Sequence, residues 1–202
     1  MTNTSSTGGY LTPASTPAPL EGQALLRFFQ QIIVGVSGLP GDMVRPYWQT
    51  EPPNVPEQGE AWCAFKIARR PSDEYPFVGR LPYLPEDQGD HLQRHEELNV
   101  ATTFYDTGSN GQADYFAALF RDGMAVPQNR EPLFLAGMGL TKIGDALSVP
   151  ELLKKRWQYR VDFEFSVNRQ IDRYYPVNTI IAAEGTIYYD NGLPPQPWSV
   201  NT

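Results

Sequence analysis

The sequence predicts a single α+β domain: an antiparallel or mixed β-sheet with helices packed on one face, and flexible N- and C-terminal arms. Residues 21–37 carry apolar side chains at the spacing of an amphipathic helix, and residues 157–168 alternate between apolar and polar. The elements follow in the order helix, strands, helix, strands. Strands that follow one another with few helices between them favour an antiparallel or mixed sheet. The chain divides into an N-terminal arm (1–20), the domain (21–190) and a C-terminal arm (191–202).

The first twenty residues have the Ser, Thr, Gly and Pro content of a flexible arm. Tyr10 and Leu11 are large apolar residues within it, and they can either dock on a neighbouring subunit or stay idle. No basic segment followed by an apolar run is present, so this is not the pattern of a signal peptide.

The first helix is predicted from Glu21 to Ser37. Glu21 favours the N-terminal end, and Gly38 followed by Pro40 ends the helix. Its apolar positions recur every three to four residues, as expected for a helix with one buried face. They are Leu25, Leu26, Phe28, Phe29, Ile32, Ile33 and Val36.

Two strands and two loops are predicted next. Residues 43–48 form a short strand that Pro46 confines to an edge or a bulge, and residues 62–69 form a longer one. Residues 50–59 are an irregular loop between these strands. Residues 71–90 are a Pro-, Gly- and acid-rich excursion, and a loop of that length is usually functional or poorly ordered.

A long strand from His91 to Tyr105, with one buried face, leads into a turn and a second helix. The run TGSNG (107–111) predicts a turn that caps the helix of residues 112–124. The segment from Leu133 to Ile143 contains several glycines, and we expect it to be an irregular strand.

The strongest strand begins at Trp157 and has one apolar and one polar face. Arg160, Asp162 and Glu164 share the polar face, where pairing across strands or between subunits is expected rather than acid–base catalysis. The aromatic residues Trp62, Trp157 and Phe163 are expected in the core. The basic triplet Lys154-Lys155-Arg156, just before the strand, is interpreted as a solvated helix end.

The sequence after residue 168 is less regular. Tyr174, Tyr175 and Pro176 are expected to interrupt the long strand, and residues 179–189 form another extended segment. The C-terminal arm has one large anchor, Trp198.

Charge and composition exclude several classes of protein. The net charge is −7 and the pI is about 4.8, which argues against tight binding of nucleic acid but allows DNA to pass without sticking. The lone cysteine, Cys63, lies in an apolar run and is expected to be buried, so no disulfide framework is predicted. The longest apolar stretch, Ile32 to Val36, is too short to span a bilayer, so a cytosol-like compartment is expected.

The sequence offers little for catalysis, and we expect no catalytic residues, no cofactor and no metal. His91 and His95 are the two histidines, but Leu92 follows His91 where a zinc protease helix needs a glutamate. Cys63 and His95 could meet in the fold, although no nucleophile motif surrounds either. The alternatives are a metal-dependent hydrolase built on His91, His95 and Cys63, and a monomeric binding module.

Most of the chain resembles the neck or tail terminator proteins of tailed bacteriophages. The segments that carry the resemblance are YLTP (10–13), APLEGQAL (18–25), GLPGDMVRPYWQTEPPNVP (38–56), AWCAFKIARR (61–70), LQRHEEL (92–98), YFAALFRDGMAVPQNRE (115–131) and LAGMGLTKIGDALSVPELLKKRWQYRVDFEFSVNRQIDRYYPV (135–177). The Pro-rich loop of residues 71–90 and the extension after Asp190 depart from the family pattern, which leaves the neighbours of those segments open.

The resemblance implies a structural virion protein, assembled in the host cytoplasm, that brings no catalytic residues. Such proteins form a closed ring, usually sixfold, that caps the tail tube and joins it to the head connector, with DNA passing through the lumen. A head–tail joining or completion protein, or a minor tail protein, is the alternative within this class. The expected interface residues are Tyr10, Leu11, Arg160, Asp162, Glu164 and Trp198.

Overall fold

The structure is a computed structural model, and it describes residues 8–14, 18–48, 56, 59–79, 89–106, 108, 111–153, 156–177, 182–189 and 194–201. Contacts divide the chain into two compact units. The main unit comprises Ala18–Pro76 and Arg94–Ile171. The minor unit comprises Met1–Pro17, Phe77–Gln93 and Asp172–Thr202. The division into arms at residues 20 and 190 stays a prediction.

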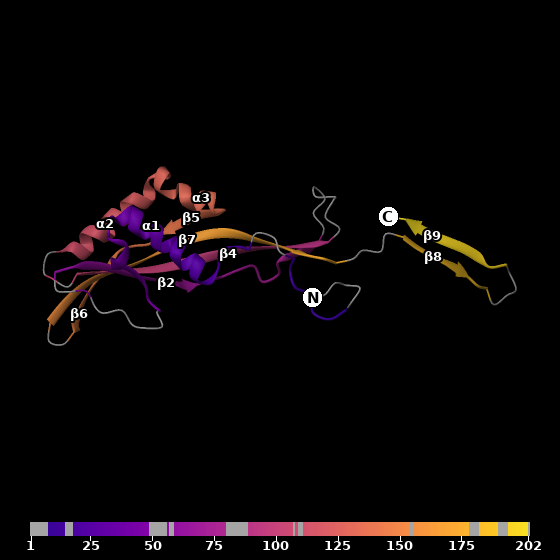
Figure 1. The fold of residues 1–202 in the computed structure, drawn as a ribbon, viewed down its shortest axis with the longest axis horizontal. Helices are drawn as coiled ribbons and strands as arrows, with labels where there is room; N and C mark the ends of the chain where they lie inside the picture. The colour runs from indigo at the N-terminus through magenta and orange to yellow at the C-terminus, as the bar shows by residue number, and fades with distance from the viewer. Residues whose placement is uncertain are drawn as a thin grey trace. The chain divides into compact units, whose positions relative to one another are not determined.

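The main unit is a mixed β-sheet with its helices on one face, so the predicted α+β class is confirmed (Figure 1). The strand order is β1-β2-β4-β7-β5, and β6 also pairs with β7. The strands are β1 (Val44–Pro46), β2 (Ala61–Arg69), β4 (Asp90–Asp106), β5 (Met138–Ile143), β6 (Leu147–Leu153) and β7 (Arg156–Tyr175), and the ends of β4 and β7 belong to the minor unit.

Among the described residues of the main unit, three α-helices and two short 3-10 helices complete the fold. The first helix ends as predicted, because Gly38 adopts a left-handed conformation (φ 76°) and its N–H donates to the carbonyl of Val34. A left-handed backbone suits glycine, which has no Cβ to clash. The elements are α1 (Gly22–Ser37), η1 (Gly41–Met43), α2 (Gln112–Ala125), η2 (Pro127–Arg130) and α3 (Glu131–Leu135).

Strand pairing in the main unit is parallel at one edge and antiparallel elsewhere. β1 pairs in parallel with β2, while β2 pairs antiparallel with β4 and β5 and β6 pair antiparallel with β7. The hydroxyl of Thr102 donates to the carbonyl of Phe163, and Asn99 bonds to Ser166. Because these contacts run in opposite directions along the two strands, β4 and β7 are also antiparallel.

The core lies between the sheet and the helices, and aromatic rings dominate it. Phe165 of β7 is fully buried, with its ring centroid 6.0 Å from that of Phe29 on α1 and 5.6 Å from that of Phe120 on α2. Phe163, also buried, stacks 5.8 Å from Phe104 of β4. Both helices and both central strands therefore share one hydrophobic cluster.

A buried ion pair fastens the start of α1 to the sheet. Arg169 of β7 lies 2.7 Å from the carboxylate of Glu96 on β4, and both side chains are almost fully buried. A second guanidinium nitrogen of Arg169 donates to the carbonyl of Leu20, just before α1. Charged groups buried this deeply must be paired to be tolerated.

The described part of the minor unit shows two short pairings of strands. Strand β3 (Phe77–Gly79) pairs with the first residues of β4, and β8 (Ala182–Ile187) pairs with β9 (Gln196–Asn201). The extended segment expected at residues 179–189 is thus confirmed over Ala182–Ile187, while residues 179–181 lie outside the described residues. β9 lies within the expected C-terminal arm. Among the described residues, no helix is long and apolar enough to cross a membrane.

Two local predictions were wrong, at residues 154–156 and at the segment from residue 133. The basic triplet at residues 154–156 does not follow a helix, because β6 ends at Leu153 and β7 begins at Arg156. The segment from residue 133 begins as the helix α3, and its strand starts only at Met138. The expected interruption at Tyr174-Tyr175-Pro176 is confirmed, because β7 ends at Tyr175. Within the predicted turn, residues 107, 109 and 110 lie outside the described residues, and Gly111 is the N-cap of α2 in a left-handed conformation (φ 67°) with no side-chain cap. Asp106 instead accepts the N–H of Gln112 at 3.0 Å.

Candidate assembly interface

The hairpin of β6 and β7 exposes apolar side chains at the end of the main unit. Leu152 pairs with Trp157, and Pro150 pairs with Tyr159, so these four side chains lie on one side of the hairpin. The exposed fraction is 57% for Leu152, 63% for Trp157 and 49% for Tyr159. We call Pro150, Leu152, Trp157 and Tyr159 the hairpin knob.

The position of α2 explains why the hairpin knob is uncovered. The hydroxyl of Ser148 lies 3.2 Å from the carboxylate of Asp114, which places the first turn of α2 next to Ser148 and its partner Val161. Val161 is buried, but the residues nearer the turn extend past the helix layer. The prediction that Trp157 belongs to the core was therefore wrong, although Phe163 is buried as predicted.

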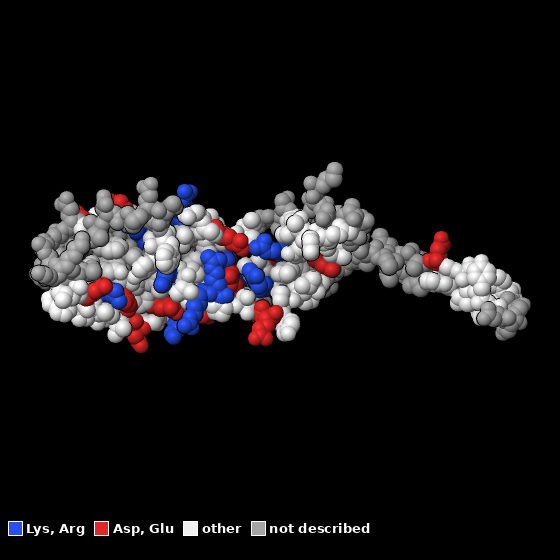
Figure 2. Space-filling view, turned by 90° about the horizontal axis from the view of Figure 1, so that it is seen from below, with Lys and Arg blue, Asp and Glu red and all other residues white. Residues whose placement is uncertain are grey.

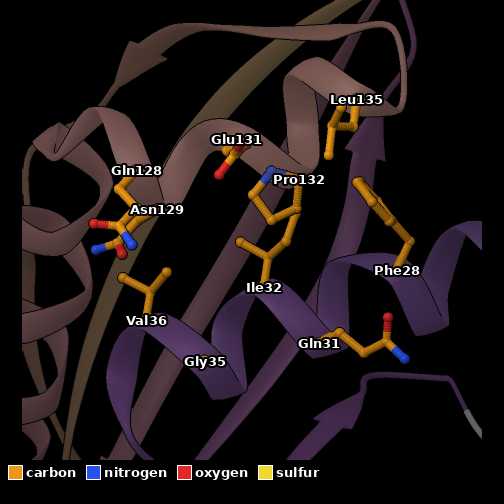
Figure 3. A pocket seen from close by; sticks show the side chains of 10 residues that line it. All are labelled: Phe28, Gln31, Ile32, Gly35, Val36, Gln128, Asn129, Glu131, Pro132 and Leu135. Carbon is orange, nitrogen blue, oxygen red and sulfur yellow. The ribbon is translucent and has the colours of Figure 1, made fainter.

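A groove between α1 and α3 is the concave counterpart in the same unit (Figure 3). Its volume is about 460 Å³. On one side α1 presents Phe28, Ile32 and Val36, and on the other Pro132 and Leu135 point toward them. Leu135 is 78% exposed, so an apolar wall of the groove remains open to solvent. We call this cavity the α1–α3 groove.

Gly35 leaves space on the α1 side of the groove. A Cβ added at this position would meet no atom within 4 Å, and its backbone is ordinary helix. Glycine inside a helix costs about 1 kcal/mol relative to alanine. A larger residue at position 35 is therefore compatible with the helix and would project into the groove.

The other side of the sheet, which the helices leave open, is polar. Arg160 donates to the Glu151 carboxylate at 3.0 Å, and its Nε lies 3.3 Å from the Asp162 carboxylate. Glu164 accepts a hydrogen bond from Asn99. Figure 2 views the molecule from below, and basic and acidic side chains are intermixed there rather than gathered by sign.

The pKa of Arg160 reflects this pairing. Partial burial acts to lower it, but the carboxylates of Asp162 and Glu151 outweigh burial and leave the pKa above its ordinary value. The expected interface residues Arg160 and Asp162 therefore already form an ion pair within the chain, although Arg160 Nε and Asp162 Oδ1 are buried without a hydrogen-bond partner. Such half-exposed pairs contribute little to stability, about 0–1 kcal/mol, and they remain accessible to a neighbouring subunit.

Aromatic residues flank this polar side. Trp62 stacks on Tyr105 with ring centroids 4.2 Å apart, and the hydroxyl of Tyr47 donates to Thr103. Burial and then the hydrogen bond with Tyr47 raise the pKa of Tyr105. Trp62 is half-buried in this stack, on the side of the sheet away from the core.

The remaining expected interface residues lie in the minor unit. Tyr10 is 94% exposed and Leu11 is half-buried. Trp198 lies on β9 opposite Gly185 of β8 and is 44% exposed. Sequence reasoning missed the hairpin knob and the α1–α3 groove. The consecutive apolar residues Phe134 and Leu135 after Pro132 were a usable signal, since a short helix that buries one face cannot bury both.

The structure gives Cys63, His91 and His95, the residues considered for catalysis, different surroundings and different contacts. Cys63 is fully buried, as predicted, and burial raises the pKa of its thiol. His91 lies 3.3 Å from Asp172, and His95 lies 3.1 Å from Asp73. The backbone N–H of His95 and then its side chain lower the pKa of the Asp73 carboxyl. Over the described part of the chain, no three His, Cys, Asp or Glu side chains gather as metal ligands.

Comparison with known families identifies one matching description. The family model described as "Phage neck terminator protein" matches residues 23–192. That range is more than half of the 202-residue chain, and it includes the hairpin knob, the α1–α3 groove and the polar side of the sheet. A comparison with curated proteins gives no match.

Proposed function

Because the chain belongs to the phage neck terminator protein family, we propose that it forms a closed, sixfold ring at the neck of a tailed phage. Membership itself gives the chain a structural role at the neck, contact with other neck or tail proteins, and a place in the virion. The ring would cap the tail tube, stop its growth and join it to the head connector. The observation that carries this proposal is the family match over residues 23–192.

The surfaces of the main unit support assembly by contacts between unlike faces. The chain has a protruding apolar surface at the β6–β7 hairpin and a concave one beside α1. Contacts between two different surfaces generate a ring when the rotation between copies closes. In this proposal Tyr10, Leu11 and Trp198 contact neighbouring neck subunits, as do Arg160, Asp162 and Glu164.

The charge of the chain suits a lumen through which DNA travels. A net charge of −7 and intermixed signs on the open side of the sheet give a duplex no basic track to follow. Like charge keeps DNA from adhering to the wall as it passes. The ring thus guides DNA by its shape, without specific binding and without a cofactor.

Deletion of the gene in the phage, followed by electron microscopy of the particles, tests the role. Tails of abnormal length are expected if the protein ends tail growth. Complete heads beside detached tails of normal length would favour the alternative of a head–tail joining protein. Infectious particles of normal appearance would overturn both, and would return attention to His91, His95 and Cys63.

A further inference from the structure

The hairpin knob is a contiguous, exposed apolar surface of the main unit. Trp157, Leu152 and Tyr159 expose about half or more of their surface on one side of a hairpin that extends past α2. Contiguous exposed apolar side chains of this size mark interaction sites in soluble proteins. Tryptophan and tyrosine are also the residues that contribute most to protein interfaces.

A chain cannot place its own hairpin knob in its own α1–α3 groove. The first turn of α2 lies beside Ser148 of the hairpin, whereas the last turn of α2 leads directly into η2 and α3. A helix of 14 residues is roughly 21 Å long. The two surfaces therefore lie at opposite ends of α2. Figure 1 shows β6 near one end of this helix and α3 near the other.

The two surfaces match in size and in charge. Pockets of about 300–1,000 Å³ hold small ligands, so a groove of about 460 Å³ accommodates an indole ring and a leucine side chain. Glu131 is the one charged residue among the described residues that line the groove. In the sequence, the basic triplet Lys154-Lys155-Arg156 separates Leu152 from Trp157. Basic residues adjacent in sequence to Trp157 and an acidic residue in the groove wall are complementary in charge.

We propose that the hairpin knob of one copy docks in the α1–α3 groove of a second copy. Trp157 and Leu152 would contact Phe28, Ile32 and Leu135 of that copy. Each pair of copies keeps one free knob and one free groove, so the contact propagates head to tail until the ring closes. The inference rests on the proposed function, because it supplies the contact by which the proposed ring forms.

Thiol crosslinking in assembled particles tests the contact. The full-length double variant Gly35→Cys, Leu152→Cys is supplied to the deletion phage, and the particles are treated with a short bismaleimide. Position 35 is open and Leu152 is exposed, whereas the native Cys63 is buried and unreactive. A denaturing gel is expected to show a ladder of covalent oligomers that ends at one highest species.

The single variants are the matched controls. Gly35→Cys or Leu152→Cys alone should remain monomeric on the gel, and particles containing both single variants should stop at dimers. Capped particles of the double variant that yield only monomers would overturn the docking contact while the ring remained. A product whose mass is not a multiple of this chain would assign the groove to another partner. Normal particles from the deletion phage would refute the proposed function itself.

Filling the groove is an independent test. Gly35→Phe should unfold at the same or higher denaturant concentration than the wild type but fail to restore capped tails. Ala118→Phe is the control, because Ala118 lies on an exposed part of α2. Equal complementation by the two variants would contradict docking in the groove.

Discussion

The two ends of β7 within the main unit have the same sequence pattern but different surroundings. Phe163, Phe165 and Val167 alternate with polar residues and are buried beneath the helices. Trp157 and Tyr159 continue the same alternation on the same side, yet they are 63% and 49% exposed. Alternation therefore predicts which side of a strand is apolar, but it does not predict whether anything in the chain covers that side.

The length of the helix layer makes the difference. α2 begins beside Ser148, and residues of the hairpin that lie past this point have no helix over them. The covered half of β7 contributes to folding of the isolated chain. The uncovered half gains its stabilisation only when a second surface removes it from water.

Truncation in the covered half should have the largest effect on stability. Phe165→Ala removes a fully buried ring that packs against Phe29 and Phe120. The free energy of unfolding should fall by about 3–5 kcal/mol, from the lost burial and the cavity left behind. Urea unfolding followed by circular dichroism measures the change. A loss below about 1 kcal/mol would mean that this half of β7 is not the core of the domain.

Breaking the buried ion pair between Glu96 and Arg169 should cause the second-largest loss of stability. It shows whether buried charged groups in the covered region are as sensitive to substitution as the buried aromatic core. Arg169→Met leaves Glu96 buried without its partner and removes the bond to Leu20. The free energy of unfolding should fall by about 3 kcal/mol.

The double variant Glu96→Leu, Arg169→Met is the control, because it leaves no unpaired charge. It should recover most of the lost stability in the same unfolding assay, since apolar replacements of buried pairs are often neutral. Equal destabilisation by the single and double variants would show that the bond to Leu20, rather than the ion pair, provides the stabilisation.

Sequence patterns predicted the covered region well. The periodicity of residues 21–37 located α1, and Gly38 predicted its end, because both signals depend on local backbone geometry and one buried side. The alternation of residues 98–104 likewise located β4. Periodicity along the chain thus predicts a helix or strand correctly where the apolar side of that element is buried within the same chain.

The uncovered region could not be predicted for a physical reason. Whether Trp157 is buried depends on where α2 begins relative to β7, which is a tertiary relation that spacing along the chain does not encode. The basic triplet at residues 154–156 fits a helix end and a hairpin turn equally well, so β6 was missed. Prediction of the groove would have required knowing which side of α3 packs on α1, and the sequence pattern does not give this.

The boundary between the two halves depends on Asp106. This buried carboxylate accepts the N–H of Gly108 at 2.7 Å and that of Gln112 at 3.0 Å, and so it fixes where α2 starts. Asp106→Ala should lower the free energy of unfolding by about 1–2 kcal/mol, the cost of losing a helix cap. Hydrogen exchange should show the accompanying loss of protection in the first turn of α2.

Asp106→Asn is the matched control, because its amide oxygen can still accept one of these bonds. It should lose less stability than Asp106→Ala in the same unfolding assay. If both variants were as stable as the wild type, the start of α2 would have to be fixed by other contacts.

The smallest effect on stability is expected at Trp157, although it is a large aromatic residue of the kind usually found in cores. Trp157→Ala removes a large aromatic residue, but one whose surface is already 63% in water. The free energy of unfolding should change by no more than about 0.5 kcal/mol, as for other exposed positions. In the phage, the same variant should reduce the number of capped tails at least tenfold, since it removes the centre of the proposed contact.

This separation of stability from assembly is what distinguishes the two halves of β7. Phe165→Ala is its counterpart, because it should fail in unfolding and in assembly together. If Trp157→Ala destabilised the isolated chain by several kcal/mol, Trp157 would have to be covered within one copy. If Trp157→Ala were neutral in both assays, the exposed aromatic residues of the hairpin would have no part in the ring. If Trp157→Ala leaves stability intact but abolishes assembly, then one end of β7 stabilises the fold and the other end joins copies of the chain.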